Sequence, residues 1–310
     1  MVGRTLSVRL GFGLPISGSW ATGENMLTIA TRAEQLGYDS LWTFQRLLHP
    51  LDAEWGSMYH AVHDPLIALA HVAAVTQRIR LGVAVANAPF YAPLLLAKQL
   101  TTLDEVSAGR LDVGLGLGWA NQEFAAVGAP MEHRGARTAE FVRCLKAIWD
   151  DDERGFDGRF FQVPPARIEP KPRQRPHPPL LLGGTAQPAL RRVGRIADGW
   201  VSSSRQNLDT IAKDIAVIAA SAEQADRDPS QLRYIVRGVI GLGERVQDGD
   251  RRALHGSADQ IRDDLDRLGQ AGVTEVFLDL NFDPQVTADG ADPEESMAKA
   301  EGVLQAMRPL

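Results

Sequence analysis

The sequence contains one cysteine, Cys144, among 310 residues. A single thiol cannot form an internal disulfide, so a disulfide framework is excluded as a source of stability. Cys144 stands in a helical stretch beside Leu145 and Ile148. We therefore expect it to be a buried, unreactive thiol.

Long apolar runs and an excess of positive charge are also missing. No stretch approaches the roughly 18 apolar residues that a membrane span requires, and residues 1–14 lack the apolar core of a secretory signal. We therefore expect a cytoplasmic protein without membrane contact. The formal net charge is -6, and no basic stripe with interleaved aromatic residues occurs. Nucleic acid is therefore not an expected partner.

Short apolar runs alternate with amphipathic segments along the whole chain. Such strands are typical of a parallel sheet that is buried on both faces. Strands are expected at residues 8–14, 40–44, 79–86, 111–117, 179–183, 199–203, 234–241 and 275–280. Helices are expected at residues 25–36, 66–76, 93–106, 137–149, 188–196, 208–225, 258–271 and 293–307. This alternation predicts a single domain over residues 1–310 with the (β/α)8 TIM-barrel fold; a doubly wound open sheet is the alternative.

One long segment interrupts the alternation. Residues 150–178 contain six prolines together with Gly155 and Gly158, so they cannot form a long helix. We expect an insertion between the fourth helix and the fifth strand, with a hairpin near residues 155–162. Long loops in compact domains often act as functional segments or lids.

The residues that follow the strands indicate the kind of site. In a TIM barrel the active site lies at the carboxyl ends of the strands, and here these positions are rich in aromatic residues and glycines. They hold few paired carboxylates, which favours binding of a flat conjugated ring over hydrolysis. His60, His63 and Asp64 have no third ligand at a telling spacing, so no metal site is expected.

Two groups of glycines stand at these strand ends. Gly183 and Gly184 end a strand just before a helix, where backbone N–H groups can bind a phosphate; a simple tight turn is the alternative. Gly114, Gly116 and Gly118 share one face of a strand. They leave room either for a planar ligand or for close packing inside the barrel.

Several longer motifs resemble one protein family. They are residues 37–42 (GYDSLW), 78–82 (RIRLG), 93–118 (PLLLAKQLTTLDEVSAGRLDVGLGLG), 133–137 (HRGAR), 156–161 (FDGRFF), 179–184 (PLLLGG) and 195–200 (RIADGW). In this order they resemble the luciferase-like monooxygenases. The glycine strand and residues 156–161 are similar to the branch that uses the deazaflavin coenzyme F420. The resemblance implies a barrel that binds the coenzyme at its carboxyl mouth and transfers a hydride.

The resemblance also assigns roles to single residues. It implies a bulge at Ala84 and Val85, often with a non-proline cis peptide, that supports the rear face of the coenzyme ring. Backbone N–H groups around Gly184 would hold the phosphate. The full set of implied cofactor-binding residues is Ala84, Val85, Gly116, Leu117, Gly118, Gly183, Gly184, Thr185 and Ala186.

The chain departs from the family pattern at the expected catalytic positions. Gln45 and Arg46 stand where many relatives have an Asp-His pair, and Trp119 replaces an acid. Sugar-phosphate oxidation is therefore not expected. We expect Gln45, Arg46 and Trp119 to be catalytic, with Arg46 stabilising negative charge on the ring or on a substrate; a surface ion pair is the alternative for Arg46.

An apolar substrate pocket is expected beside the ring, and it would suit reduction of an activated double bond, an imine or a nitroaromatic. Its expected residues are Trp20, His49, Trp55, Phe90 and Tyr91. Two other functions stay open. One is an FMN-dependent two-component monooxygenase that receives reduced flavin from a cofactor-reducing enzyme, and the other is a non-catalytic flavin-binding barrel. The resemblance further implies a homodimer.

Overall fold

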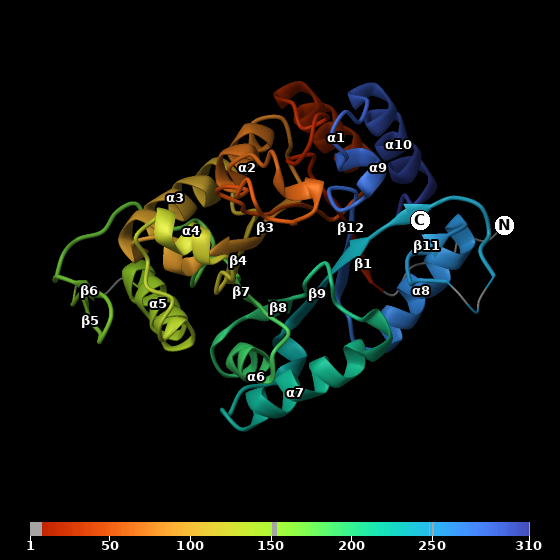
Figure 1. The fold of residues 1–310 in the computed structure, drawn as a ribbon. Helices are drawn as coiled ribbons and strands as arrows, with labels where there is room; N and C mark the ends of the chain where they lie inside the picture. Colours follow the sequence, from red (N-terminus) through yellow and green to blue (C-terminus); the bar gives the residue numbers. More distant parts are fainter. Residues whose placement is uncertain (1–7, 151–153, 248, 250, 310) are drawn as a thin grey trace.

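The computed structural model describes residues 8–150, 154–247, 249 and 251–309, and its centre is a closed barrel of parallel strands (Figure 1). The barrel strands are β1 (Arg9–Gly13), β2 (Ser40–Thr43), β3 (Arg80–Asn87), β4 (Leu111–Gly116), β7 (Leu180–Gly183), β8 (Gly199–Val201), β9 (Arg233–Val239) and β12 (Glu275–Asp279). β1 pairs with β2 on one side and with β12 on the other, where Arg9 stands opposite Glu275. This closure confirms the TIM-barrel prediction and excludes the open sheet.

Helices cover the outside of the barrel. They are α1 (Gly23–Gln35), α2 (Pro65–Ala73), α3 (Pro93–Val106), α5 (Arg134–Trp149), α6 (Gln187–Ile196), α7 (Ile211–Glu223), α8 (Ala258–Gln270) and α10 (Pro293–Ala306). The sequence did not predict two short helices in the loops after β4 and β12, α4 (Asn121–Ala126) and α9 (Pro284–Thr287). The segment expected as one helix from residue 208 begins as a 3-10 turn, Leu208–Thr210, before α7.

The described part of the insertion forms a hairpin at the expected place. β5 (Phe156–Asp157) pairs antiparallel with β6 (Gln162–Val163), and Figure 1 shows this hairpin beyond α5, away from the barrel. A carboxylate oxygen of Glu140 on α5 accepts the N–H groups of Phe160 and Phe161 at 2.6 and 2.9 Å. None of residues 154–178 lines the main cavity described below.

The amino end of the barrel interior is filled by an ion-pair network. Asp112 on β4, fully buried, accepts hydrogen bonds from Arg80 at 2.6 Å and from Arg233 at 2.5 Å. Arg233 also donates to Glu275 at 3.0 Å. Burial alone would raise the pKa of Asp112, but the hydrogen bonds and charges of the two arginines outweigh it and lower that pKa.

An apolar layer lies above this network. Successive inward positions on a strand are two residues apart, so Trp42 and Phe277 follow Ser40 and Glu275 along the barrel. Their rings stack with centroids 5.2 Å apart. A Cβ atom added at Gly82 would lie 2.4 Å from the Trp42 ring, so glycine is required there by the space that the indole occupies.

We expect the Asp112→Asn variant to lose about 3 kcal/mol of unfolding free energy, because two partly buried arginines would lose the fully buried anion that they share. Chemical denaturation at neutral pH measures this loss. The wild-type contribution is present above the pKa of an unfolded aspartate and is lost as the pH falls through the lowered folded-state pKa. The variant should therefore show a weaker dependence of stability on pH in acid.

The matched control is Glu105→Gln. Glu105 pairs with Arg173 at 3.9 Å, with both side chains more than half exposed, and its loss should cost less than about 1 kcal/mol. Equal effects of the two substitutions would contradict the importance of the buried network.

Candidate active site

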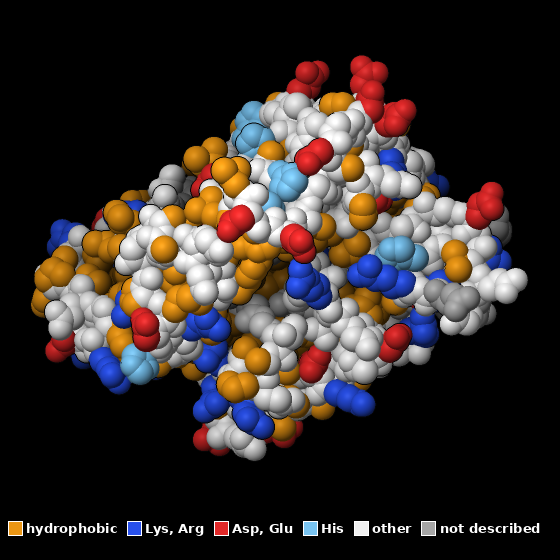
Figure 2. Space-filling view, in the orientation of Figure 1, with side chains coloured by type: hydrophobic (Ala, Val, Ile, Leu, Met, Phe, Trp, Pro, Cys, Tyr) orange, Lys and Arg blue, Asp and Glu red, His pale blue; other side chains and the backbone are white. Residues whose placement is uncertain are grey.

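A cavity of about 430 Å³ opens at the carboxyl ends of the barrel strands. In Figure 2 it is the hollow near the centre of the molecule, with basic side chains beside it. Its size is within the range of small-molecule sites. Its lining comprises Phe44, Gln45, Arg46, Tyr59, Ala84, Val85, Asn87, Gly116, Leu117, Gly118, Trp119, Arg134, Gly183, Gly184, Thr185, Ala186, Ala189, Val201, Ser202, Ser203, Ser204, Arg237 and Phe282.

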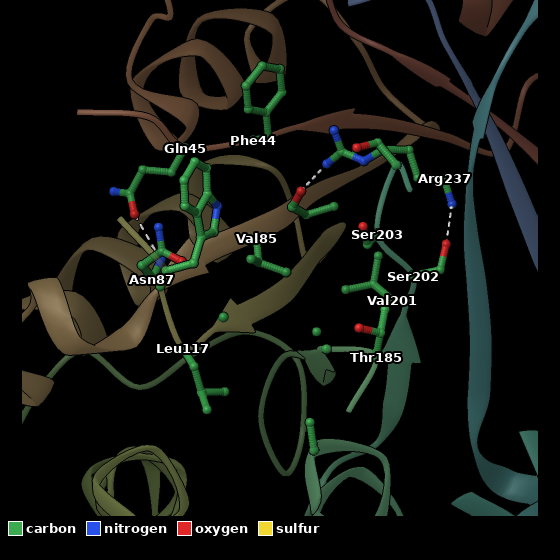
Figure 3. Close-up of a pocket in the computed structure, with 18 of the residues that line it drawn as sticks. Phe44, Gln45, Val85, Asn87, Leu117, Thr185, Val201, Ser202, Ser203 and Arg237 are labelled. Atoms are coloured by element: carbon green, nitrogen blue, oxygen red, sulfur yellow. Dashed lines mark hydrogen bonds between the residues drawn. The ribbon is translucent and has the colours of Figure 1, made fainter. Parts of the chain in front are cut away.

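One wall is built around Val85. The register between β3 and β4 shifts between Val83 and Ala86, and the Ala84–Val85 peptide is cis, as the resemblance implied. A Cβ atom added at Gly116 would lie 2.4 Å from Val85 Cγ2, and one at Gly183 would lie 3.1 Å from Val85 Cγ1. These glycines make room for the Val85 side chain, which lines the cavity (Figure 3).

The floor contains a buried arginine that the sequence reasoning missed. Arg237 on β9 lies at the cavity (Figure 3). It pairs with Asp279 at 3.1 Å and donates a hydrogen bond to the carbonyl oxygen of Ala84. Burial lowers the pKa of Arg237, and the charge of Asp279 opposes this shift. The sequence did contain a signal for this pair. Arg237 and Asp279 are charged residues at inward positions of two mostly apolar strands, β9 and β12.

A donor-rich end lies where β7 leads into α6. Ala186 is the residue before α6. His133, with a φ of 55°, is the residue before α5. No side chain caps the start of either helix. Arg134 lines the cavity at this end. Uncapped N–H groups at helix starts attract anions.

A second cation, Arg192 on α6, lies close to this end. A Cβ atom added at Gly135 would lie 2.5 Å from Arg192 Nη2, so the guanidinium packs tightly against the start of α5. Burial and the neighbouring Arg195 both lower the pKa of Arg192. An anion bound here would offset this repulsion between like charges.

Arg46 is not a surface residue, contrary to the alternative interpretation. It is 8% exposed, and its Nε lies 3.3 Å from Oε1 of Glu123, which is fully buried. The guanidinium carbon lies 4.6 Å from the centre of the Trp119 ring, 5.0 Å from that of Tyr59 and 5.2 Å from that of Trp55. Burial lowers the pKa of Arg46, and Glu123 opposes this shift.

Gln45 has a positioning function in this structure. Its Oε1 accepts the N–H of Asn87 at 2.8 Å, and its Nε2 donates to the Tyr91 hydroxyl at 2.5 Å. Gln45 thereby ties β2 to the end of β3 at the cavity wall. Asn87 directly follows the strand predicted at residues 79–86, but sequence reasoning gave it no role. Glu123 was missed because its partner, Arg46, is distant in sequence.

The residues expected to form the substrate pocket lie outside the cavity lining. Trp20 is fully buried in the hydrophobic core, which corrects its assignment. The Phe90 ring packs on Phe124 at 5.1 Å, and Tyr91 is held by Gln45. His49 and Trp55 contact each other at the rim, with ring centroids 5.5 Å apart. In contrast, every residue expected to bind the cofactor lines the cavity.

The histidines considered as metal ligands have other partners. His60 Nδ1 lies 2.8 Å from an oxygen of Asp289, and His63 Nε2 lies 2.7 Å from the carbonyl oxygen of Ala21. Among the described residues, no group of three or more His, Cys, Asp or Glu side chains is arranged to hold a metal ion.

Comparison with known proteins decides the family. The model of the luciferase-like monooxygenase family matches residues 10–253. The chain belongs to this family. It is therefore an oxidoreductase, as its family members are.

Two curated relatives of this luciferase-like protein differ in cofactor. An FMNH2-dependent dimethylsulfone monooxygenase of Pseudomonas putida is 35% identical over 199 residues, which are 61% of this chain and 54% of the relative. An F420-dependent hydroxymycolic acid dehydrogenase of Mycobacterium tuberculosis is 27% identical over 307 residues, covering 96% and 80%.

Two solved structures share the fold of this family member. A monooxygenase from Streptomyces bottropensis superposes with a TM-score of 0.79 at 23% identity, covering 97% of this chain and 99% of the other. An F420-dependent secondary alcohol dehydrogenase gives a TM-score of 0.78 at 18% identity, with the same coverage.

In the part of the chain that the structure describes, no helix combines the length and the apolar character needed to cross a membrane.

We expect Gly184→Val to weaken cofactor binding at least about tenfold. Gly184 has a φ of +134°, and an added Cβ would lie 2.7 Å from the Ala189 Cβ, so the loop before α6 must move. Fluorescence titration with F420 and with FMN measures the dissociation constants. Gly302→Ala is the control, because nothing lies within 4 Å of a Cβ added there. An unchanged dissociation constant in a folded Gly184→Val protein would contradict this placement of the phosphate.

Proposed function

We propose that this luciferase-like oxidoreductase uses F420 and transfers a hydride between the deazaflavin and a small organic substrate. The observation that carries the proposal is a cavity with an apolar wall at Val85 and a donor-rich end between α5 and α6. The alignment with the F420-dependent relative supports it, because that alignment extends over 96% of the chain. The resemblance of the glycine strand and of residues 156–161 to the F420 branch supports it as well.

The residues present fit such a cofactor. In this proposal Ala84 and Val85 support the rear face of the ring, while Gly116, Leu117 and Gly118 leave room along its edge. The N–H groups of residues 183–186, together with Arg134, would hold the phosphate, where Gly184 allows the backbone to approach. When bound, the deazaflavin would supply the ring carbon that gives or accepts the hydride.

Two arginine side chains of this protein would stabilise the negative charge that develops during the reaction. Arg237 is fixed by Asp279 and by the Ala84 carbonyl, and it places a buried positive charge at the cavity floor. Arg46 places a second one between the rings of Tyr59 and Trp119. Positive groups that are already oriented stabilise developing negative charge without reorganisation.

A second candidate function is the FMN-dependent monooxygenase. The FMNH2-dependent relative favours it, because that relative is 35% identical to this chain in the aligned region. In that case the protein would need a separate cofactor-reducing enzyme as its partner, and its cavity would have to accept oxygen beside the reduced flavin.

Titration of the purified protein with F420 and with FMN separates the two candidates. We expect saturable F420 binding, followed by reduction or oxidation of bound F420 when a panel of alcohols, ketones, imines and activated alkenes is added. Absorbance of the deazaflavin reports the hydride transfer. FMN binding without F420 binding, together with oxygen consumption by the reduced FMN complex, would overturn the proposal and support the monooxygenase. F420 binding without hydride transfer to any compound of this panel would contradict a neutral alcohol, ketone, imine or alkene as the substrate.

A further inference from the structure

Arg46 has hydrogen-bonding capacity that the protein does not use. Its Nε and Nη1 are buried and have no hydrogen-bond partner. The acid that pairs with it is Glu123, whose Oε1 already accepts the N–H of Leu47 at 2.7 Å. A buried donor without an acceptor is costly, so a ligand that supplies an acceptor at this position would be favoured.

The carboxylates that pair with the cavity arginines lie behind them. Arg46 and Arg237 line the cavity, whereas Glu123 and Asp279 do not. Among the described lining residues, three are arginines and none is Asp or Glu. Each ion pair therefore presents its positive end to the cavity, and a negative group inside would meet a favourable potential.

The three arginines are not equivalent. Arg237 already has Asp279 and the Ala84 carbonyl as partners. Arg134 stands at the donor-rich end, which the proposed function assigns to the cofactor phosphate. Arg46 is therefore the cation that remains for a group on the substrate.

The surroundings of Arg46 indicate the rest of the substrate. Tyr59 and Trp119 both line the cavity and flank the guanidinium, and Phe282 lies 5.9 Å from Tyr59 by ring centroids. Trp119 is 50% exposed. These apolar faces can cover a hydrocarbon or aromatic body, while the guanidinium of Arg46 can donate a charge-assisted hydrogen bond to an oxyanion.

We propose that the substrate is an amphipathic organic acid, with an apolar body and one carboxylate or sulfonate group that binds Arg46. This inference rests on the proposed function in assigning the cavity to substrate and cofactor. It narrows the apolar substrate expected from the sequence to one with a charged head.

The test measures ligand binding separately from catalysis. Hexanoate and hexane-1-sulfonate are compared with 1-hexanol and hexanamide, with and without saturating F420. Tryptophan fluorescence reports binding, because Trp55 and Trp119 lie beside Arg46 whereas Trp20, Trp42, Trp149 and Trp200 are fully buried. We expect the two acids to bind at least about tenfold more tightly than the neutral compounds, as for a charged hydrogen bond.

The decisive variant is the double substitution Arg46→Met/Glu123→Gln. Removing both charges avoids leaving one of them buried without a partner, and Gln keeps an oxygen for the Leu47 N–H. This protein should lose the preference for acids while it still binds F420. Arg46→Lys should retain part of the preference, because lysine supplies the charge without the planar fork. Arg173→Met, at an exposed ion pair with Glu105, should behave as the wild type.

Three outcomes would overturn the proposal. They are equal binding of acids and neutral compounds by the wild type, a full preference for acids in the folded double variant, and displacement of the acids by inorganic phosphate in the F420 complex. Failure of the wild type to bind F420 would instead contradict the proposed function, and the comparison of acids with neutral compounds in the cofactor-free protein would still test Arg46.

Discussion

The width of an eight-stranded barrel limits what its interior can hold, and the site depends on this limit. Eight strands leave a space that side chains just fill. Trp42 and Phe277 occupy the middle of that space, so charged groups are confined to the layers below and above them. The lower layer, around Asp112, closes the amino end. The upper layer, Arg237 with Asp279, forms the floor of a cavity that opens toward the carboxyl ends.

Most of the fold could be predicted from the sequence, because buried parallel strands produce a signal that repeats along the chain. The apolar runs located every barrel strand, and the helix expected at residues 258–271 is α8, which begins after a capping box formed by Ser257 and Gln260. The short helices α4 and α9 were missed. Helices of this length have little intrinsic stability, and their formation depends on contacts that local sequence patterns do not encode.

The candidate site was predicted unevenly, for a physical reason. The glycines at the ends of β4 and β7 line the cavity with their backbone. The position of a backbone segment follows from its place in the barrel, so these residues could be assigned to the site from the sequence. The direction of a large side chain depends on its surroundings, so Trp20 was assigned to the pocket although it is in the core. Arg237 and Glu123 were missed because their partners are distant in sequence, Asp279 and Arg46.

The segment after β12 supports the mouth of the cavity. Phe282 packs against Phe44 and Tyr59, and Asp289 holds His60 of the loop that carries Tyr59. This segment lies beyond residue 253, where the match to the family model ends, whereas the glycines of the donor-rich end lie before it. The mouth of the cavity is thus built jointly by residues inside the matched region and by this last segment. A change of sequence after β12 would therefore alter the shape of the mouth while leaving the glycines of the donor-rich end in place.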